Sequence, residues 1–394
     1  MAHKIKVVIG AGFGDEGKGL LTDYFCSSFP KDEPVLNVRF NGGAQAGHTV
    51  VTPYGLRHVF GHFGAGSFLP NVATYLSSEF LVNPILFRRE YEKLLEQGLR
   101  PMVFMHPKCL LTIPQDMMIN QMVERFRGAA RHGSCGVGIF ETIYRSKFEF
   151  GITLDKALDG RTISRLTDRD YSSWHLEELG VVKVSEEDKA LLSNQNISAH
   201  YCDDVRFMRN HVIIADESVL NKFRNIVFEG AQGLMLDQNN LDYFPHLTPS
   251  NTGIQNVVEC LSKAGISEED LEVCYVTRTY LTRHGAGRFN TECPREFMHG
   301  VRVDKTNHHN EFQGGFRYGL FDQSMFVEHV LRDVDRLGAR NAKLTIAFTH
   351  ADETEDMVYT ANGRRIPVKE FKMPKVDVNY ISRGEKRINI EKMR

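Results

Sequence analysis

The sequence predicts an α/β fold in which a large, mostly parallel central sheet is flanked by helices. Three observations lead to this prediction. Short apolar runs, typical of buried strands, alternate with segments whose apolar residues recur at helical spacing. The first apolar run leads into a glycine-rich turn and then into a helical pattern. No internal repeat, low-complexity tract or linker divides the 394 residues, so we expect a single domain over residues 1–394.

The expected strands and helices follow one another along the chain. The first strand is KVVIG (6–10), a helix continues from Gly17 to about Ser28, and VLNVRF (35–40) is the second strand. Similar apolar runs predict further strands at 102–105, 225–228, 273–280 and 343–348. Residues 323–337 have the apolar spacing of a helix. Residues 151–222 are more charged and carry weaker patterns, and we interpret them as a helical insertion.

The composition is that of an ordinary globular protein in a reducing compartment. Hydrophobic residues make up 42% of the chain and charged residues 25%. The formal net charge of −2 lacks the positive excess typical of proteins that bind nucleic acid or anionic membranes. No segment has the length and apolar character of a signal peptide or a membrane span. Seven cysteines without a C-x-x-C pair indicate reduced thiols, so we expect a cytoplasmic protein without nucleic acid or membrane partners.

The stretch GAGFGDEGKG (10–19) contains two phosphate-loop patterns. It fits G-x-x-x-x-G-K, but Gly19 stands where a P-loop has Ser or Thr for magnesium. It also fits the dinucleotide fingerprint G-x-G-x-x-G, but Asn41, rather than an acid for the ribose, follows the second strand. A strand, a glycine turn and a helix present backbone N–H groups to an anion, and Lys18 adds a positive charge. The stretch therefore favours phosphate binding, with Asp15 as a metal ligand or a base; the alternative for Asp15 is a cap of the helix.

A second glycine cluster, RFNGGAQAGHT (39–49), follows the second strand. Together with GDEGKG (14–19) it resembles the adenylosuccinate synthetase family, whose paired signatures have the forms GDEGKG and GGxNAGHT. The resemblance implies that family's fold, a large sheet related to that of P-loop proteins, and it is thinnest over 151–222. Its further matches are FEGAQGLMLD (228–237), PHLTPSNT (245–252), TRHGAGRFNTE (282–292), THAD (349–352) and SRGEKR (382–387).

The resemblance implies a reaction that joins L-aspartate to carbon 6 of a purine nucleotide. A nucleoside triphosphate first phosphorylates the 6-oxygen, which turns that oxygen into a leaving group. Asp15 would remove the N1 proton, and His48 would stabilise the charge that develops on the phosphate. Mg²⁺ would bind to Asp15 and the Gly47 carbonyl, because this ion prefers oxygen ligands. Taken alone, His48 would be an interior histidine, and it is the pairing of the two glycine clusters that favours the catalytic interpretation.

The same resemblance assigns residues to the two nucleotides. Asp352 would read the guanine of GTP as the phosphate donor, with a turn residue at a strand end as the alternative. The other expected contacts of the donor are Gly14, Glu16, Gly17, Lys18, Gly19, Gly47, His48, Thr49, Ser382, Gly384 and Arg387. The expected contacts of the purine monophosphate are Asp15, Gln45, Ser134, Cys135, Gln232 and Thr248. Arg145 is expected to reach the site of a partner subunit in a homodimer, and its alternative is a solvated surface charge.

The expected aspartate-binding loop departs from the pattern TTGRRRRTGW of the common bacterial and eukaryotic enzymes. This chain has NEFQGGFRYGLFD (310–322), which is shorter and keeps one arginine. We expect Gln313, Gly314 and Arg317 to contact L-aspartate, with Arg317 holding a carboxylate in a bidentate pair. The alternative for Arg317 is that it pins the loop through backbone carbonyls.

The shortened loop, HGSCGVG (132–138) and the Ala44-Gln45 variant of the second signature are similar to the archaeal branch of the family and its phage relatives. Those phage enzymes, the 2-aminoadenylosuccinate synthetases, take dGMP and make a precursor of 2-aminoadenine. We therefore expect dGMP as the acceptor and GTP as the donor. An ordinary synthetase that takes IMP is the alternative. A catalytically inactive nucleotide-binding protein is an alternative of another class, disfavoured because Asp15, Lys18, His48 and Arg317 are retained together.

Overall fold

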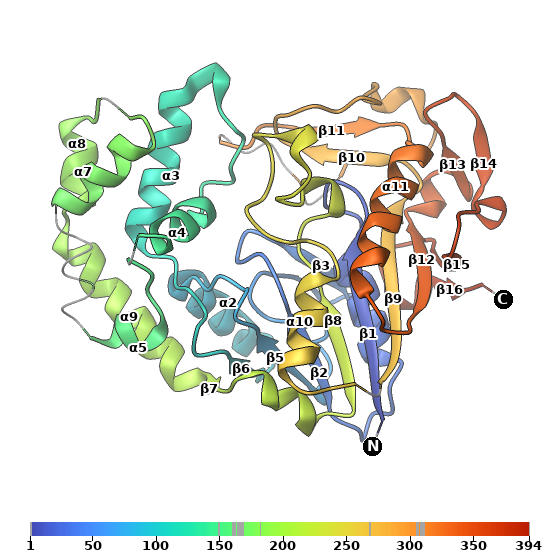
Figure 1. The fold of residues 1–394 in the computed structure, drawn as a ribbon, viewed down its shortest axis with the longest axis horizontal. Helices are drawn as coiled ribbons and strands as arrows, with labels where there is room; N and C mark the ends of the chain where they lie inside the picture. The colour runs from blue at the N-terminus through green and yellow to red at the C-terminus, as the bar shows by residue number, and fades with distance from the viewer. Residues whose placement is uncertain are drawn as a thin grey trace.

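The computed structural model describes residues 2–148, 150–159, 163, 169–181, 183–267, 269–304, 307 and 312–393. Its centre is a ten-stranded sheet with the order β16-β15-β12-β9-β1-β8-β2-β5-β6-β7 (Figure 1). All neighbouring strands of this sheet run parallel except β15 and β16, so the predicted fold class is confirmed. The strands are β1 (His3–Gly10), β2 (Val35–Arg39), β5 (Val72–Leu76), β6 (Met102–Met105), β7 (Ile213–Ile214), β8 (Asn225–Glu229), β9 (Glu269–Arg278), β12 (Lys343–Thr349), β15 (Asp377–Ser382) and β16 (Ile390–Lys392).

Three two-stranded antiparallel ribbons and ten α-helices complete the described part of the chain. The ribbons are β3 (His48–Val51) with β4 (Arg57–Phe60), β10 (Leu281–His284) with β11 (Phe316–Gly319), and β13 (Met357–Tyr359) with β14 (Arg365–Pro367). The helices are α1 (Lys18–Ser27), α2 (Pro84–Glu96), α3 (Pro114–Arg127), α4 (Ile139–Ser146), α5 (Leu154–Leu158), α7 (Arg169–Glu178), α8 (Glu186–Leu192), α9 (Gln195–His211), α10 (Gln255–Lys263) and α11 (Gln323–Val334).

The central strands are buried on both faces, which explains their continuous apolar sequences. Val7 and Ile9 of β1 pack in one core with residues of α10 and α11, whereas Val8 between them packs in another core with α1. All three side chains are fully buried. Successive residues of a strand point to opposite faces, so the neighbouring residues Val7, Val8 and Ile9 are all apolar. In Figure 1, α10 and α11 lie across the near side of this part of the sheet.

The strands and helices predicted from the sequence are confirmed. The expected strands at 6–10, 35–40, 102–105, 225–228, 273–280 and 343–348 correspond to β1, β2, β6, β8, β9 and β12, with ends that differ by a few residues. The expected helices correspond to α1 and to α11 with the short 3₁₀ turn that follows it at Asp335–Leu337. No sequence pattern predicted β5, β7, β15, β16 or the three ribbons.

The described residues between 151 and 222 are mainly helical. Helix α9 packs against α2 through Tyr201, Val205 and Met208, and the α7–α8 region packs against α3. The same stretch also contributes the short edge strand β7. Residues 160–162, 164–168 and 182 of the expected insertion lie outside the described residues. That this segment is an insertion into a single domain over 1–394 stays a prediction.

Within the described ranges, no helix has both the length and the apolar character needed to cross a membrane. All seven cysteines of the chain lie in the described ranges, and none of them forms a disulfide.

Candidate active site

Three glycine-rich loops meet at the carboxyl ends of β1, β8 and β2, which are neighbours in the sheet (Figure 1). A side chain on Gly233 would overlap the carbonyl oxygen of Gly12, and one on Gly42 would lie 2.6 Å from the Cβ atom of Ala231. Asn41 ties two of the loops together, because its Oδ1 atom accepts from the Ala231 N–H at 2.7 Å and its Nδ2 atom donates to the Ala231 carbonyl at 3.0 Å. Parallel α/β sheets bind ligands at such carboxyl ends.

The first loop forms an anion cradle that the carboxylate of Glu16 fills. Its Oε1 atom accepts from the backbone N–H groups of Gly12 at 3.0 Å and Gly14 at 2.8 Å. Its Oε2 atom lies 2.5 Å from the Lys18 ammonium, and both side chains are buried. These are the donors that a phosphate oxygen needs at the start of a helix. In this structure the predicted phosphate ligand Lys18 is thus paired with Glu16.

The close approach of β3 explains why Gly19 replaces the Ser or Thr of a P-loop. A Cβ atom on Gly19 would lie 2.9 Å from the Cβ atom of His48 and 3.2 Å from the Thr49 carbonyl oxygen. A hydroxyl-bearing side chain therefore does not fit at this position. The absence of a side chain lets His48 lie against the first turn of α1, beside the cradle.

Three residues with left-handed backbone conformations gather around these loops. Asp15, Gln232 and His350 have φ angles of 61°, 63° and 58°. For residues other than glycine this conformation costs roughly 1–2 kcal/mol, and such strain is concentrated at functional sites. The helix cap of α1 is Gly17, so the alternative of Asp15 as a cap is wrong. Burial raises the pKa of the half-buried Asp15 carboxyl, although the positive charges of Arg278 and Lys18 oppose the shift.

His48 is held by Glu229, the last residue of β8. The Nδ1 atom of His48 hydrogen-bonds one carboxylate oxygen of Glu229, and the other accepts from the Ala65 N–H at 3.0 Å. Burial lowers the pKa of His48 to about 4, despite the attraction of Glu229. Burial also disfavours the charge on Glu229, but Arg39 and His48 outweigh it and hold the Glu229 pKa below its usual value. His48 is therefore neutral at pH 7, with its Nδ1 proton directed to Glu229.

Three other residues predicted to contact the purine monophosphate are half-buried: Gln45, Gln232 and Thr248. The Gln45 Oε1 atom is buried and has no hydrogen-bond partner in this structure. A buried polar atom without a partner is uncommon in a folded protein, so a ligand that completes it would account for its presence. Gln232 follows Ala231 in the loop after β8, and the Thr248 N–H donates to the Leu236 carbonyl at 2.9 Å.

The loop 132–138 lies against His246, whose Nδ1 atom is 3.0 Å from the His132 carbonyl oxygen, but Ser134 points its hydroxyl hydrogen into the protein. Ser134 Oγ donates to Asn120 Oδ1 at 2.6 Å and accepts from the Gly136 N–H at 3.2 Å. Asn120 in turn donates to Glu141 at 3.0 Å. Ser134 would have to leave Asn120 before it could donate to a phosphate. Burial raises the pKa of the Cys135 thiol to about 11, so Cys135 is neutral.

The prediction that Arg145 reaches a partner subunit is wrong. Its side chain is fully buried, so the alternative of a solvated charge is also wrong. The guanidinium pairs with Asp116, with Nη2 at 2.8 Å from Oδ2, and donates to the carbonyls of Leu111 at 2.8 Å and Phe150. Each of its three side-chain nitrogens donates a hydrogen bond within this chain, so this arginine holds the fold together.

Arg317 is engaged within its own chain. Its Nε atom donates to Glu292 at 2.9 Å and Nη2 donates to the other carboxylate oxygen. Its Nη1 atom donates to the carbonyls of Gly285 at 3.1 Å and Gly287 at 2.8 Å, which is the loop-pinning arrangement. Gln313 lies against the same loop, since a Cβ atom on Gly285 would be 2.9 Å from the Gln313 carbonyl oxygen. Contact of Gln313, Gly314 and Arg317 with aspartate stays a prediction, and Arg317 would have to exchange Glu292 for the ligand.

The expected donor-side residues lie at the ends of β12 and β15. Thr349 Oγ1 donates to the Glu16 carbonyl at 2.7 Å, which joins the end of β12 to the cradle. Asp352 accepts from Arg302 Nη2 at 2.9 Å. Ser382 donates to the Gly384 carbonyl at 2.8 Å, and Arg387 donates to Asp23 of α1 at 2.7 Å. These segments are therefore near the cradle, and Asp352 and Arg387 are both paired in this structure.

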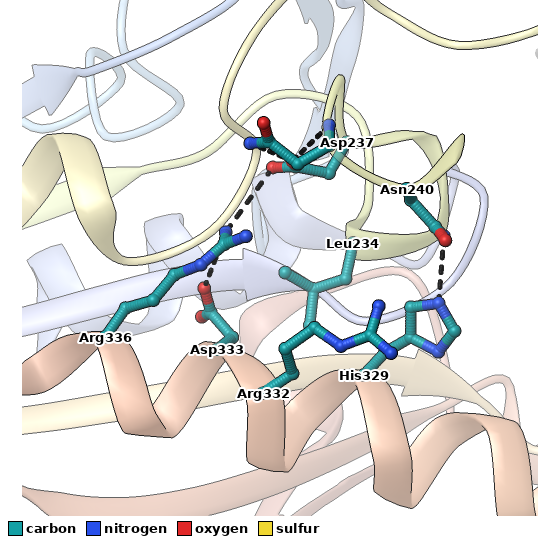
Figure 2. A pocket seen from close by; sticks show the side chains of 8 residues that line it. Leu234, Asp237, Asn240, His329, Arg332, Asp333 and Arg336 are labelled. Carbon is teal, nitrogen blue, oxygen red and sulfur yellow. Dashed lines mark hydrogen bonds and ion pairs between the residues drawn. The ribbon is translucent and has the colours of Figure 1, made fainter. Parts of the chain in front are cut away.

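Behind the segment that carries Thr248 lies a polar pocket against α11, which Figure 2 shows. Asp333 accepts from the Ile254 N–H at 3.0 Å, and Asp237 accepts from the Thr252 N–H at 2.7 Å. Arg336 lies 3.8 Å from both carboxylates. The two aspartates hold the turn that follows Thr248, so this pocket supports the site from behind.

A magnesium site with few protein ligands fits these residues. In the described part of the chain, no group of three or more His, Cys, Asp and Glu side chains is placed to hold a metal ion. Mg²⁺ is commonly held by one or two carboxylates together with substrate phosphates and waters. Beside the anion cradle, the half-buried Asp15 supplies carboxylate oxygens and the exposed Gly47 supplies a carbonyl oxygen for such a site.

Comparison with known proteins gives consistent matches. Residues 7–337 match the family model described as adenylosuccinate synthetase. Adenylosuccinate synthetase 1 of Photorhabdus laumondii is 25% identical over 354 residues, which are 88% of this chain and 78% of that protein. The adenylosuccinate synthetase of Synechococcus elongatus is 30% identical over 292 residues, 73% of this chain and 62% of that protein.

Two solved structures share the fold. The fully ligated adenylosuccinate synthetase from Plasmodium falciparum superposes with a TM-score of 0.71 at 18% identity, over 99% of this chain and 100% of that chain. The succinoaminodeoxyadenylate synthetase of cyanophage S-2L, bound to dGMP and to dATP as an energy donor, gives a TM-score of 0.61 at 15% identity. That match covers 100% of this chain and 96% of the other.

Replacing Glu229 by Gln tests the buried charges around His48. The amide cannot neutralise Arg39, and breaking a buried pair costs about 3–5 kcal/mol. We expect a loss of unfolding free energy of that size in urea denaturation at pH 7. Glu328, which pairs with Arg332 at the surface, is the control, and Glu328→Gln should cost less than about 1 kcal/mol. Equal, small losses of unfolding free energy in both variants would show that the fold does not need the Glu229 charge to neutralise Arg39.

Replacing Glu141 by Gln tests the polar layer under the loop 132–138. Glu141 Oε2 is buried without a partner, and burial raises the Glu141 pKa from 4.5 to about 8. Between these values the unfolded chain has lost the proton that the folded chain keeps, so stability falls as pH rises. We expect the unfolding free energy of Glu141→Gln, relative to that of wild type, to rise by at least ~1 kcal/mol from pH 5 to pH 8. Thermal unfolding at the two pH values measures this difference. A stability difference that is the same at both pH values contradicts this, and exposed Glu177→Gln serves as the control.

Proposed function

The chain belongs to the adenylosuccinate synthetase family, and from that premise we propose that it joins L-aspartate to carbon 6 of a purine nucleoside monophosphate. Membership makes the protein a GTP-dependent ligase that forms a carbon–nitrogen bond. One observation carries the assignment of the site. Asp15, Lys18 and His48 come from two separate loops, and both loops border the same anion cradle.

The proposed first step is transfer of the γ-phosphoryl group of GTP to the 6-oxygen of the purine. Asp15 takes the N1 proton, which makes the 6-oxygen a nucleophile, and the bond between the γ-phosphorus and its bridging oxygen breaks to release GDP. Lys18 leaves Glu16 and pairs with the phosphates. In the second step the amine of aspartate attacks carbon 6, and inorganic phosphate leaves.

His48 is suited to the phosphate because Glu229 fixes its ring. A neutral imidazole whose Nδ1 proton is directed to an ionised carboxylate presents Nε2 to a ligand. When Nε2 gains a proton, Glu229 stabilises the resulting positive charge next to the phosphate. Asp15 and the Gly47 carbonyl would hold Mg²⁺, which supplies charge neutralisation to the transferred phosphoryl group.

We propose dGMP as the acceptor, in a homodimeric cytoplasmic enzyme. The support is the shortened loop around Arg317, the Ala44-Gln45 and Ser134-Cys135 sequences, and the shared fold of the cyanophage enzyme bound to dGMP. That enzyme is bound to dATP, whereas Asp352 here favours guanine, because a carboxylate accepts from the N1–H and 2-amino groups. IMP is the second candidate, favoured by the names of the curated relatives.

The acceptor is decided by steady-state kinetics with purified protein. Each of dGMP, GMP, dIMP and IMP is combined with aspartate and with GTP, ATP or dATP. We expect kcat/KM for dGMP with GTP to exceed that for IMP by about tenfold or more, since IMP leaves an acceptor for the 2-amino group unpaired at about 1–3 kcal/mol. A tenfold preference for IMP would identify an ordinary adenylosuccinate synthetase. Nucleotide binding without turnover of any combination would favour the inactive binding protein.

The Asp15→Asn variant tests the base. Asparagine tolerates the left-handed backbone of this position, so we expect the fold to persist. Without the carboxylate, proton removal and Mg²⁺ binding are lost, and kcat should fall at least ~10²-fold. Exposed Asp242→Asn is the control. A kcat close to that of wild type in Asp15→Asn would show that Asp15 is not the base.

A further inference from the structure

We propose that Arg278, at the end of β9, is a positioning residue that fixes the main chain at Asp15 for the reaction proposed above. Its Nε atom donates to the Asp15 carbonyl oxygen at 2.8 Å, across 263 residues of sequence. This inference rests on the proposed function, because it concerns the residue that takes the N1 proton there. It adds a residue from a third strand to the two signature loops.

The guanidinium of Arg278 is also held through its two terminal nitrogens. Nη2 donates to Asp304 Oδ2 at 2.8 Å, and Nη1 donates to the Tyr280 hydroxyl at 3.1 Å. The Tyr280 hydroxyl donates in turn to Glu353 at 2.7 Å. The side chain is 4% exposed, and its planar group also lies over the ring of Phe316, 5.5 Å from the ring centre. The planar fork of an arginine bonded in three directions has a single orientation.

The loop at Asp15 depends on an anchor of this kind. Asp15 has a φ angle of 61°, and Gly14 and Gly17 on either side have φ angles of 95° and 94°. Glycines allow many backbone conformations, so they do not by themselves select this one. Glu16 holds the N–H groups of Gly12 and Gly14, and Thr349 holds the Glu16 carbonyl, whereas the hydrogen bond from Arg278 fixes the main chain at Asp15 itself. The orientation of the Asp15 carboxylate follows from its backbone, so a shift of the anchor moves the base.

A purely structural role for Arg278 is the competing explanation, since its pair with Asp304 is buried. The two roles predict different effects of replacing Arg278 in an enzyme that has already lost the Asp15 carboxylate. If Arg278 acts through Asp15, its replacement matters little once Asp15 has lost its carboxylate. If it only supports the fold, its effect is the same in both backgrounds.

The test is a double-mutant cycle of Arg278→Lys and Asp15→Asn. Lysine keeps a positive charge for Asp304, but its single nitrogen atom cannot occupy the three positions from which Nε, Nη1 and Nη2 of Arg278 donate. With the acceptor that wild type uses, we expect Arg278→Lys to lower kcat ~10- to 100-fold, with KM for aspartate and GTP changed less than about threefold. In the Asp15→Asn background it should lower kcat less than about twofold. Equal losses in both backgrounds would overturn the proposal. Tyr280→Phe, which removes one hydroxyl, should repeat the pattern with a smaller loss.

A second readout does not need turnover, so it separates failure of this inference from failure of the proposed function. Amide hydrogen exchange of the segment 11–17 should be faster in Arg278→Lys than in wild type. The control is Arg145→Lys, which weakens another buried Arg–Asp pair and should leave exchange of this segment unchanged. Unchanged exchange in Arg278→Lys would overturn the inference even if the enzyme is active. If wild type turns over none of the nucleotides, the proposed function fails while the exchange result still decides whether Arg278 anchors the loop.

Discussion

The contact of backbone against backbone between the loops after β1, β8 and β2 is the constraint on which the site depends. Gly233 against Gly12, and Gly42 against Ala231, leave no room for side chains. The contact is possible because the three strands are neighbours in a parallel sheet and end at the same edge. It brings the Ala231 main chain to the Asn41 amide, and the Met235 N–H to the Gly12 carbonyl at 3.1 Å. The same close packing explains Gly19, which gives its side-chain space to His48.

The second feature of the site is that each of three buried cations is paired with a carboxylate. Glu16 neutralises Lys18, Glu229 neutralises Arg39 beside His48, and Asp304 neutralises Arg278. Leaving one partner of a buried pair without the other is strongly destabilising. We therefore propose that ligand binding is an exchange, in which a phosphate takes the place of a carboxylate and no cation loses its partner. Glu16 and Lys18 are arranged for such an exchange, and Arg317 with Glu292 is arranged in a similar way.

The sequence predicted the central strands well, because strands buried on both faces are mostly apolar, with polar residues such as Arg39 and Glu229 near their carboxyl ends. It missed β15 (DVNYIS) and β16 (IEK), in which polar residues interrupt the apolar ones, and it also missed the apolar run VATYL of β5. That the loops which carry Asp15 and His48 meet could be predicted, because each follows a strand in a glycine-rich signature. Glu229 was missed, although an acid directly after the buried run NIVF is unusual and was a signal that could have found it. Arg145 was misinterpreted because its partner Asp116 lies 29 residues away in the sequence, and no local pattern shows such a pair.

We propose that the anion cradle in the loop 10–19 binds phosphate, and that the Glu16 carboxylate occupies it until a nucleotide binds. A crystal structure of the protein with a non-hydrolysable GTP analogue, Mg²⁺ and the acceptor nucleotide tests it most directly. We expect phosphate oxygens to accept from the N–H groups of Gly12 and Gly14, and the Lys18 ammonium to lie on a phosphate instead of on Glu16. Phosphates bound elsewhere, with the pair of Glu16 and Lys18 intact, would contradict the claim.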